Sequence, residues 1–153
     1  MRKWREGDIY AIESRENSFS RFRLLTAPLA EFYGDFSARA EDLELKDPVF
    51  KIAIHRSVIR SPKVIKIGYR ALSEADRVEE RFFKVDPIAK KLYVMWLSGR
   101  EEISSYSECK HLERASVWEF QHVAERLNDL SIGKTNKWVK LERDTLEEFN
   151  KNT

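Results

Sequence analysis

The most reactive side chains of this chain belong to one cysteine and three histidines: Cys109, His55, His111 and His122. Cys109 and His111 lie two positions apart, as ligands of a metal ion can, but no second pair of ligands accompanies them. Structural zinc sites combine two such pairs, and the chain has no His-x-x-x-His or His-Glu-x-x-His motif. The sequence therefore predicts no metal site, and no motif in it indicates another cofactor.

Nucleophilic catalysis by Cys109 would need a base and an orienting acid, and His122 and Asp129 have suitable side chains. The residues around Cys109 do not form a nucleophile motif, and a free cysteine is usually a small buried apolar side chain. The many carboxylates do not select an acid–base pair, and the isolated glycines form no phosphate-binding loop. We therefore predict no catalytic residue and a protein that is not an enzyme. A hydrolase that uses Cys109 is the alternative.

The clearest charge feature is a basic segment at residues 48–73, which contains no Asp or Glu. The whole chain is nearly balanced, with 28 basic and 26 acidic residues, which argues against a general binder of polyanions. The segment contains six Lys and Arg side chains, which are the candidate partner-binding residues: Lys51, Arg56, Arg60, Lys63, Lys66 and Arg70.

Three interpretations of this basic segment are open. A basic ribbon can grip the phosphates of a nucleic acid. It can also attract an acidic protein surface. In the third interpretation, its charges are neutralised by the acidic segments on either side of it, or its lysines protect a sheet edge from unwanted pairing.

The elements that would position these side chains are mostly short strands. Alternating or apolar runs predict strands at residues 9–12, 19–26, 29–36, 49–55, 64–71, 81–85, 92–97 and 101–106. The first two are expected to pair as a hairpin, and the last three as a hairpin or meander. Between the strands at residues 64–71 and 81–85, Ser73 can cap a single helical turn against Asp76. Strands 49–55 and 64–71 are expected to form a second hairpin, which would place the basic side chains on one ribbon.

One amphipathic helix follows the strands. Apolar residues recur at helical spacing from Val117 to Leu130; Ser116 and Glu119 have the spacing of a capping box, and Gly133 can end the helix. The order of elements predicts an α+β fold, mainly an antiparallel sheet or partly open barrel built from hairpins, with one C-terminal helix packed on it. We expect one domain at residues 1–140 and a charged tail at residues 141–153.

Several motifs, in the same order along the chain, resemble the immunity protein 26 family of bacterial polymorphic toxin systems. They are Gly7-Asp8-Ile9-Tyr10-Ala11-Ile12, Phe82-Phe83-Lys84 with Asp86, Leu112-Glu113-Arg114-Ala115-Ser116-Val117-Trp118, His122-Val123 with Arg126-Leu127 and Asp129, and Gly133 with Asn136-Lys137-Trp138. The residues that carry the resemblance most directly are Gly7, Asp8, Trp118, His122, Arg126, Asn136 and Trp138. Residues 42–70 match only loosely, which makes the basic segment the candidate for a partner-specific surface.

The resemblance implies a bacterial protein that binds a cognate protein toxin and neutralises it, by occluding its active site. We expect a monomer or small homo-oligomer in the cytoplasm, because the charged first ten residues are unlike a signal peptide and no apolar run would cross a membrane. Nucleic acid is the less favoured partner. The alternative function is a small nucleic-acid-binding β domain that uses the basic hairpin at residues 51–70.

Overall fold

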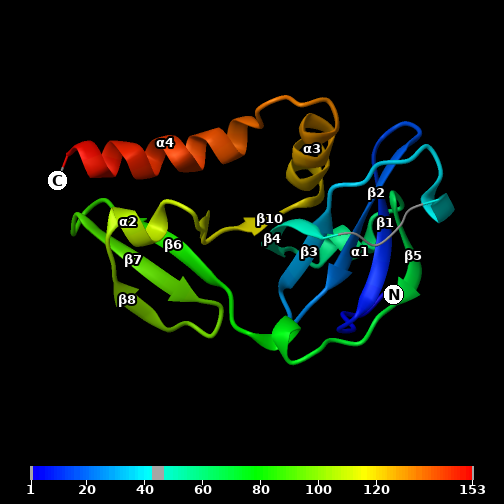
Figure 1. The fold of residues 1–153 in the computed structure, drawn as a ribbon, viewed down its shortest axis with the longest axis horizontal. Helices are drawn as coiled ribbons and strands as arrows, with labels where there is room; N and C mark the ends of the chain where they lie inside the picture. Colours follow the sequence, from blue (N-terminus) through cyan, green and yellow to red (C-terminus); the bar gives the residue numbers. More distant parts are fainter. Residues whose placement is uncertain (1, 43–46, 153) are drawn as a thin grey trace. The chain divides into compact units, whose positions relative to one another are not determined.

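The computed structural model describes residues 2–42 and 47–152 and confirms the α+β class. The chain forms two compact units, Met1–Arg77 with Val117–Asn136 and Val78–Ser116 with Lys137–Thr153. The first contains a six-stranded sheet and the second a four-stranded sheet, both open and mostly antiparallel (Figure 1). Two C-terminal helices follow the strands, whereas the sequence analysis predicts one sheet and one helix.

The sheet of the first unit has the strand order β10-β4-β3-β2-β1-β5. Its strands are β1 (Asp8–Arg15), β2 (Ser18–Leu24), β3 (Leu29–Tyr33), β4 (Pro48–Ile54), β5 (Val64–Tyr69) and β10 (Val117–Trp118). The predicted hairpin of β1 and β2 is confirmed, and Asn17 in its turn has a φ of 57°. All neighbours are antiparallel except β10 and β4, which pair in parallel through two residues each.

The predicted basic hairpin is wrong. β4 pairs with β3 and β10, whereas β5 pairs with β1, so three strands separate them in the sheet. The two strands run in the same direction and therefore need a crossover instead of a tight turn. The crossover contains α1 (Ser57–Arg60), whose Val58 and Ile59 side chains are buried.

One face of this sheet holds a row of stacked aromatic rings. Tyr10, Phe22, Phe32 and Phe50 come from β1 to β4, with successive ring centroids 5.4, 5.1 and 4.9 Å apart. At the β4 end of the row, the Arg126 guanidinium of α3 (Phe120–Ser131) lies 3.8 Å from the Phe50 ring centroid. This aromatic row gives the sheet a rigid face on which α3 packs.

The predicted helix at residues 117–130 is confirmed as α3, but its predicted start is wrong. Glu119 is the N-cap and makes no capping hydrogen bond, and the Ser116 hydroxyl donates to the Glu142 carboxylate instead. The preceding residues are held in β10 because they pair with β4. Gly133 follows the helix with a φ of 69°, the left-handed conformation expected there.

The second unit contains the predicted meander. β6 (Arg81–Asp86), β7 (Lys91–Trp96) and β8 (Glu101–Ile103) pair in sequence, and β9 (Glu113–Arg114) adds to β6 in parallel. Its buried core contains Phe83, Leu92, Val94, Cys109 and Leu146. Cys109 ends the short helix α2 (Tyr106–Cys109).

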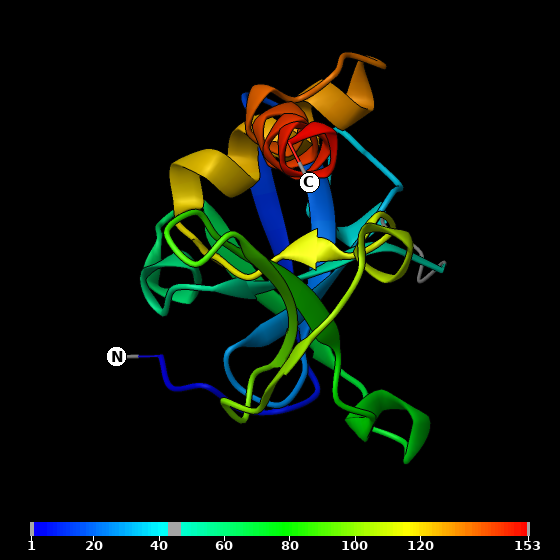
Figure 2. The same cartoon turned by 90° about the vertical axis from the view of Figure 1, so that its left-hand side faces the viewer.

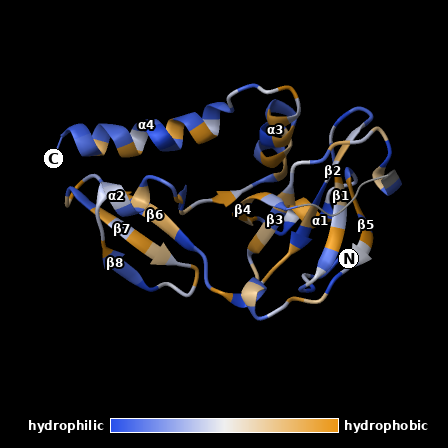
Figure 3. Ribbon diagram, viewed as in Figure 1, coloured by the Kyte–Doolittle hydropathy of each residue, from blue (hydrophilic) through white to orange (hydrophobic). Residues whose placement is uncertain are grey.

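Residues 137–151 form the continuous helix α4 (Lys137–Lys151), which is seen along its axis in Figure 2. Polar and apolar bands alternate along it (Figure 3), and Leu146 is buried in the core of the second unit. The predicted tail therefore falls largely within a helix. The division of the chain at residue 140 into a domain and a tail stays a prediction.

Arg126 offers a test of the aromatic face. Its guanidinium lies near both the Phe50 and Trp118 rings and is 9% exposed, so we expect Arg126→Ala to lower the free energy of unfolding by about 2 kcal/mol. Lys134→Ala, at an exposed residue of the same unit, should change it by less than about 0.5 kcal/mol. Urea denaturation measures both, and equal values for the two variants would contradict this role.

Candidate functional site

The opposite face of the six-stranded sheet carries a row of charged side chains. Arg23 of β2 lies directly across from Glu31 of β3, and Glu31 lies directly across from Lys51 of β4. These residues are sequence neighbours of the phenylalanines in the aromatic row, so their side chains point to the other face of the sheet. The sheet is thus aromatic on one face and charged on the other.

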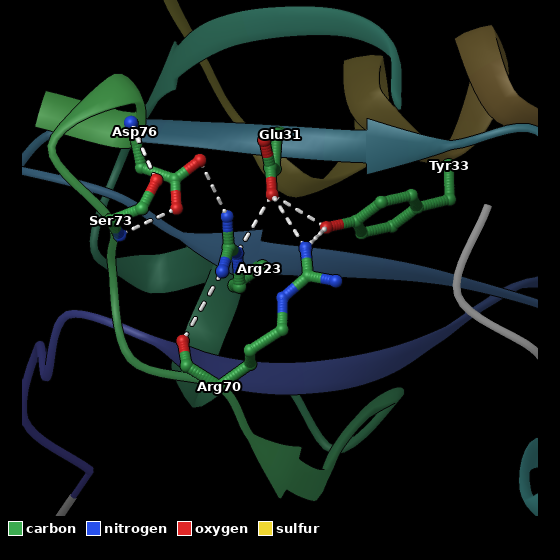
Figure 4. Close-up of polar contacts among 6 residues, drawn as sticks. All are labelled: Arg23, Glu31, Tyr33, Arg70, Ser73 and Asp76. Carbon is green, nitrogen blue, oxygen red and sulfur yellow. Dashed lines mark hydrogen bonds and ion pairs between the residues drawn. The ribbon is translucent and has the colours of Figure 1, made fainter. Parts of the chain in front are cut away.

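Arg23 is the centre of a buried ion network (Figure 4). Its Nε donates a hydrogen bond to Glu31 Oε1 at 2.7 Å, and its Nη2 lies 3.0 Å from Asp76 Oδ1. Its Nη1 donates to the Arg70 carbonyl oxygen at 3.3 Å. The Arg23 side chain is only 1% exposed. Such a buried charge is tolerated only when it is paired and hydrogen-bonded on every side.

Tyr33 and Arg70 extend this network to the surface. The Tyr33 hydroxyl donates to Glu31 Oε1 at 2.5 Å and accepts a hydrogen bond from Arg70 Nη2 at 3.4 Å. Arg70 Nη2 also lies 3.8 Å from Glu31 Oε1, and the Arg70 side chain is 50% exposed. Arg70 is therefore the most exposed charged member of the network, and solvent or a partner can reach it.

Asp76 is positioned by the short turn η2 (Ala75–Arg77). The Ser73 amide donates to Asp76 Oδ2 at 2.8 Å, and the Asp76 amide donates to the Ser73 hydroxyl at 3.3 Å. These reciprocal bonds confirm the prediction that Ser73 caps a single helical turn against Asp76. They fix the carboxylate where it meets Arg23.

The surroundings shift the pKa values of three members of the network. Burial, together with the hydrogen bond to Glu31, raises the pKa of Tyr33, which stays a neutral donor. Burial alone would lower the pKa of Arg23, but the charges of Glu31 and Asp76 and the Tyr33 hydroxyl outweigh it and raise that pKa. Burial would raise the pKa of Asp76, but the hydrogen bonds from Ser73 and the Arg23 charge outweigh it and lower that pKa.

A polar hollow of about 610 Å³ opens onto this network. It is lined by Arg23, Glu31, Asp47, Pro48, Lys51, Arg70 and Asp76. Three cations and three carboxylates line it, so it suits a partner group with a charge of its own more than an apolar ligand. The buried network forms a fixed wall, and the half-exposed Arg70 offers its guanidinium to that group. We define this hollow as the candidate binding site.

The structure brings two of the six candidate basic residues to this site. Lys51 and Arg70 both line the hollow, although they belong to distant parts of the sheet. Arg56 and Arg60 are exposed at and just before α1, in the crossover between β4 and β5.

The other two basic residues are engaged in ion pairs. Lys63 Nζ lies 3.0 Å from Glu13 Oε1, and Lys66 Nζ lies 3.2 Å from Asp8 Oδ1. The six side chains therefore do not form one ribbon.

The residues that carry the family resemblance lie mostly in structural positions. Gly7 has a φ of 92°, and a Cβ on it would lie 2.7 Å from the Arg70 carbonyl oxygen, so this position requires glycine. Asp8 is 3% exposed and pairs with Lys66. Trp118 is buried beside Arg126 of α3.

Three further motif residues lie in or after α3. His122 is partly buried on α3. Asn136 Nδ2 donates to Asp129 Oδ2 at 2.9 Å and thereby ties the loop after α3 back to that helix. Trp138 is in α4, with Lys137 Nζ 4.9 Å from its ring centroid.

The candidate nucleophile Cys109 is enclosed in the core of the second unit. Its side chain is fully buried, and burial raises the pKa of the thiol, which disfavours the reactive thiolate. Its Sγ donates weakly to the Tyr93 carbonyl oxygen at 3.9 Å. Within residues 2–42 and 47–152, the structure contains no cluster of three or more potential metal ligands.

Comparison of the chain with protein-family models, with curated proteins and with solved structures finds no match. The resemblance to the immunity protein 26 family stays a prediction. In the part of the chain that the structure describes, no helix is both long and apolar enough to cross a bilayer.

The ion network provides a stability test. Arg23→Met should lower the free energy of unfolding by about 3–5 kcal/mol, because it leaves the buried Glu31 and the partly buried Asp76 without their main partner. Arg77→Met is the matched control, since Arg77 makes an exposed ion pair with Glu6, and it should cost less than about 1 kcal/mol. Urea denaturation measures the free energy of unfolding of both variants. Similar losses for the two variants would show that the network contributes little to stability.

The lowered pKa of Asp76 predicts a pH dependence of stability. A carboxylate with a lowered pKa in the folded state stabilises it above the unfolded pKa, and this contribution is lost as pH falls through the folded pKa. The wild-type protein should exceed Asp76→Asn in unfolding free energy by a constant amount above about pH 4, and this difference should shrink below it. A difference that persists unchanged to pH 2 would contradict the assignment.

Proposed function

We propose that this protein binds a cognate bacterial toxin in the cytoplasm and neutralises it by occluding its active site. The observation that carries the proposal is the hollow at the charged face of the first unit, with Arg70 exposed at its mouth and held by Tyr33 and Glu31. The resemblance of the motif residues to an immunity protein family supports the same conclusion.

Arg70 has the properties of a binding hot spot. Arginine is over-represented among the residues that dominate protein interfaces, above all where it lies in a well-packed pocket. Contacts with Tyr33 and Glu31 already restrict the guanidinium, which reduces the entropy lost on binding. Its charge suits an acidic side chain of the toxin, and Lys51 on the same hollow adds to this preference.

A role that does not involve catalysis agrees with the surroundings of Cys109. The candidate nucleophile is buried as a thiol, and the surroundings raise the pKa of Arg23 and lower the pKa of Asp76, so both groups stay charged near neutral pH. A binding function needs such a rigid surface, whereas acid–base catalysis needs a group that can exchange a proton near neutral pH.

Nucleic-acid binding is the weaker alternative. It depends on a basic ribbon, and the strands expected to form that ribbon do not pair. Two of its lysines are occupied by Glu13 and Asp8, which reduces the charge available for phosphates.

The proposal is tested with the protein encoded by the gene next to that of this chain. Arg70→Glu should weaken binding of that protein at least 30-fold, which corresponds to the roughly 2 kcal/mol that defines a hot spot. Lys91→Glu, a charge reversal at an exposed residue of β7, should leave the affinity unchanged. Isothermal titration measures affinity, and thermal melting verifies that both variants fold.

If this chain neither binds nor inhibits the neighbouring protein, the proposed function is wrong. If the Arg70→Glu variant binds with wild-type affinity, the proposed site is wrong. Retarded migration of generic RNA or DNA at low salt would support the alternative.

The exposed cations near α1 allow a separate kinetic prediction. Arg56→Glu with Arg60→Glu should slow association with the toxin several-fold and leave the dissociation rate nearly unchanged, because exposed charges act mainly by steering. Lys63 is kept, since it pairs with Glu13. Surface plasmon resonance at low and high salt measures the association and dissociation rates separately. An association rate that changes neither with the double substitution nor with salt would contradict steering.

A further inference from the structure

β5 is an outer strand of the six-stranded sheet and pairs with β1 on one side only. Three of its apolar side chains are exposed: Ile65 at 47%, Ile67 at 38% and Tyr69 at 50%. Among the described residues, no strand pairs with its outer edge. An apolar edge of this kind is a template for pairing with another chain.

The direction of the peptide groups follows from the hydrogen bonds at the strand ends. The Glu13 amide donates to the Lys63 carbonyl oxygen at 2.9 Å, so the Lys63 peptide group faces β1. Along an antiparallel strand, the backbone N–H and C=O groups of successive residues point alternately toward the neighbouring strand and away from it. The peptide groups of Val64 and Lys66 therefore point away from β1. The Arg2 guanidinium donates to the outward Val64 carbonyl oxygen, as this alternation requires.

The other end of β5 gives the same result. The Arg70 amide donates to the Gly7 carbonyl oxygen at 2.9 Å, so the preceding residue, Tyr69, has its peptide group directed outward. A bulge in the β1–β5 pairing leaves Ile67 without a direct partner on β1. Arg2 covers the start of the strand, and the stretch from Lys66 to Tyr69 remains open.

The charges around this open stretch are positive. The Arg5 guanidinium lies 4.4 Å from the Tyr69 ring centroid, and Lys66 projects from the strand itself. Arg70 follows immediately and is half exposed. Asp8, directly across from Tyr69 on β1, is buried and pairs with Lys66 at 3.2 Å and with Arg5 at 3.9 Å.

We propose that the open edge of β5 receives an extended segment of the partner protein in which apolar and acidic residues alternate. The inference rests on the proposed function and specifies the partner's chemistry. Main-chain hydrogen bonds to Lys66 and Tyr69 would supply affinity. The apolar residues of the segment would cover Ile65 and Ile67, and its carboxylates would meet Arg5 and Arg70.

A second copy of this chain is a poor occupant of the same edge. Pairing β5 with its own copy would bring Lys63, Lys66 and Arg70 of both copies onto one ribbon. Like charges across an interface are unfavourable, so the surface discriminates against self-association.

The edge is tested with the full chain and a synthetic ten-residue peptide of alternating valine and glutamate. This peptide should bind, and the backbone amides of Lys66 and Tyr69 should then exchange with solvent at least tenfold more slowly by NMR. Ile65→Lys with Ile67→Lys should weaken peptide binding at least tenfold, because a lysine on an edge strand opposes pairing. Ile88→Lys is the matched control, since Ile88 is 94% exposed in the second unit, and it should bind normally.

The peptide also identifies wrong occupants. Equal binding of a valine–lysine peptide, or binding without protection of the Lys66 and Tyr69 amides, would overturn the inference. So would a concentration-dependent dimer that protects those amides without peptide, or protection by single-stranded RNA. If the peptide fails but the toxin still binds through Arg70, the edge inference is wrong and the proposed function stands.

Discussion

A guanidinium enclosed in a protein must have an oxygen acceptor in almost every direction, and Arg23 imposes this requirement on the first unit. Three oxygen acceptors surround the Arg23 guanidinium. Glu31 supplies one from the neighbouring strand, Asp76 supplies one from the turn after β5, and the Arg70 carbonyl supplies one from just after β5. Segments more than forty residues apart in sequence are therefore held in one arrangement. The same requirement places the Arg70 side chain beside Tyr33, so the buried charge organises the surface that a partner would meet.

The two faces of the six-stranded sheet differ in chemistry: one is aromatic and is covered by α3, and the other is charged and carries the candidate binding site. The aromatic row packs against α3, and residues shared with the family resemblance, Trp118 and Arg126, belong to this face. The charged face has a hollow in place of a close-packed cover. Since the two rows occupy adjacent positions on β2, β3 and β4, each of these three strands carries both properties.

Local patterns predicted local structure well. The first hairpin, the meander, the stripe of α3 and the Ser73–Asp76 turn are all set by neighbours in sequence. Pairing between distant strands was not predictable in this way, because alternation gives the faces of a strand and not its neighbour. The ion network was missed for the same reason: Arg23 alternates with apolar residues as an exposed side chain would. A signal was present in Glu31, which falls opposite Arg23 if residues 19–26 and 29–36 pair around Pro28.

The path of the chain has a consequence for synthesis on the ribosome. The aromatic row is complete once β4 has been made, but α3, which packs on it, includes Val123 and Leu127 and follows about 70 residues later. At a translation rate of roughly 5–20 residues per second, helix α3 is synthesised on the order of 4–15 s after β4. The intervening residues contain all four strands of the four-stranded sheet, together with β5 and β10 of the six-stranded sheet. Until α3 is translated, the apolar face of the unfinished sheet stays uncovered for seconds, and a ribosome-associated chaperone is suited to protect it.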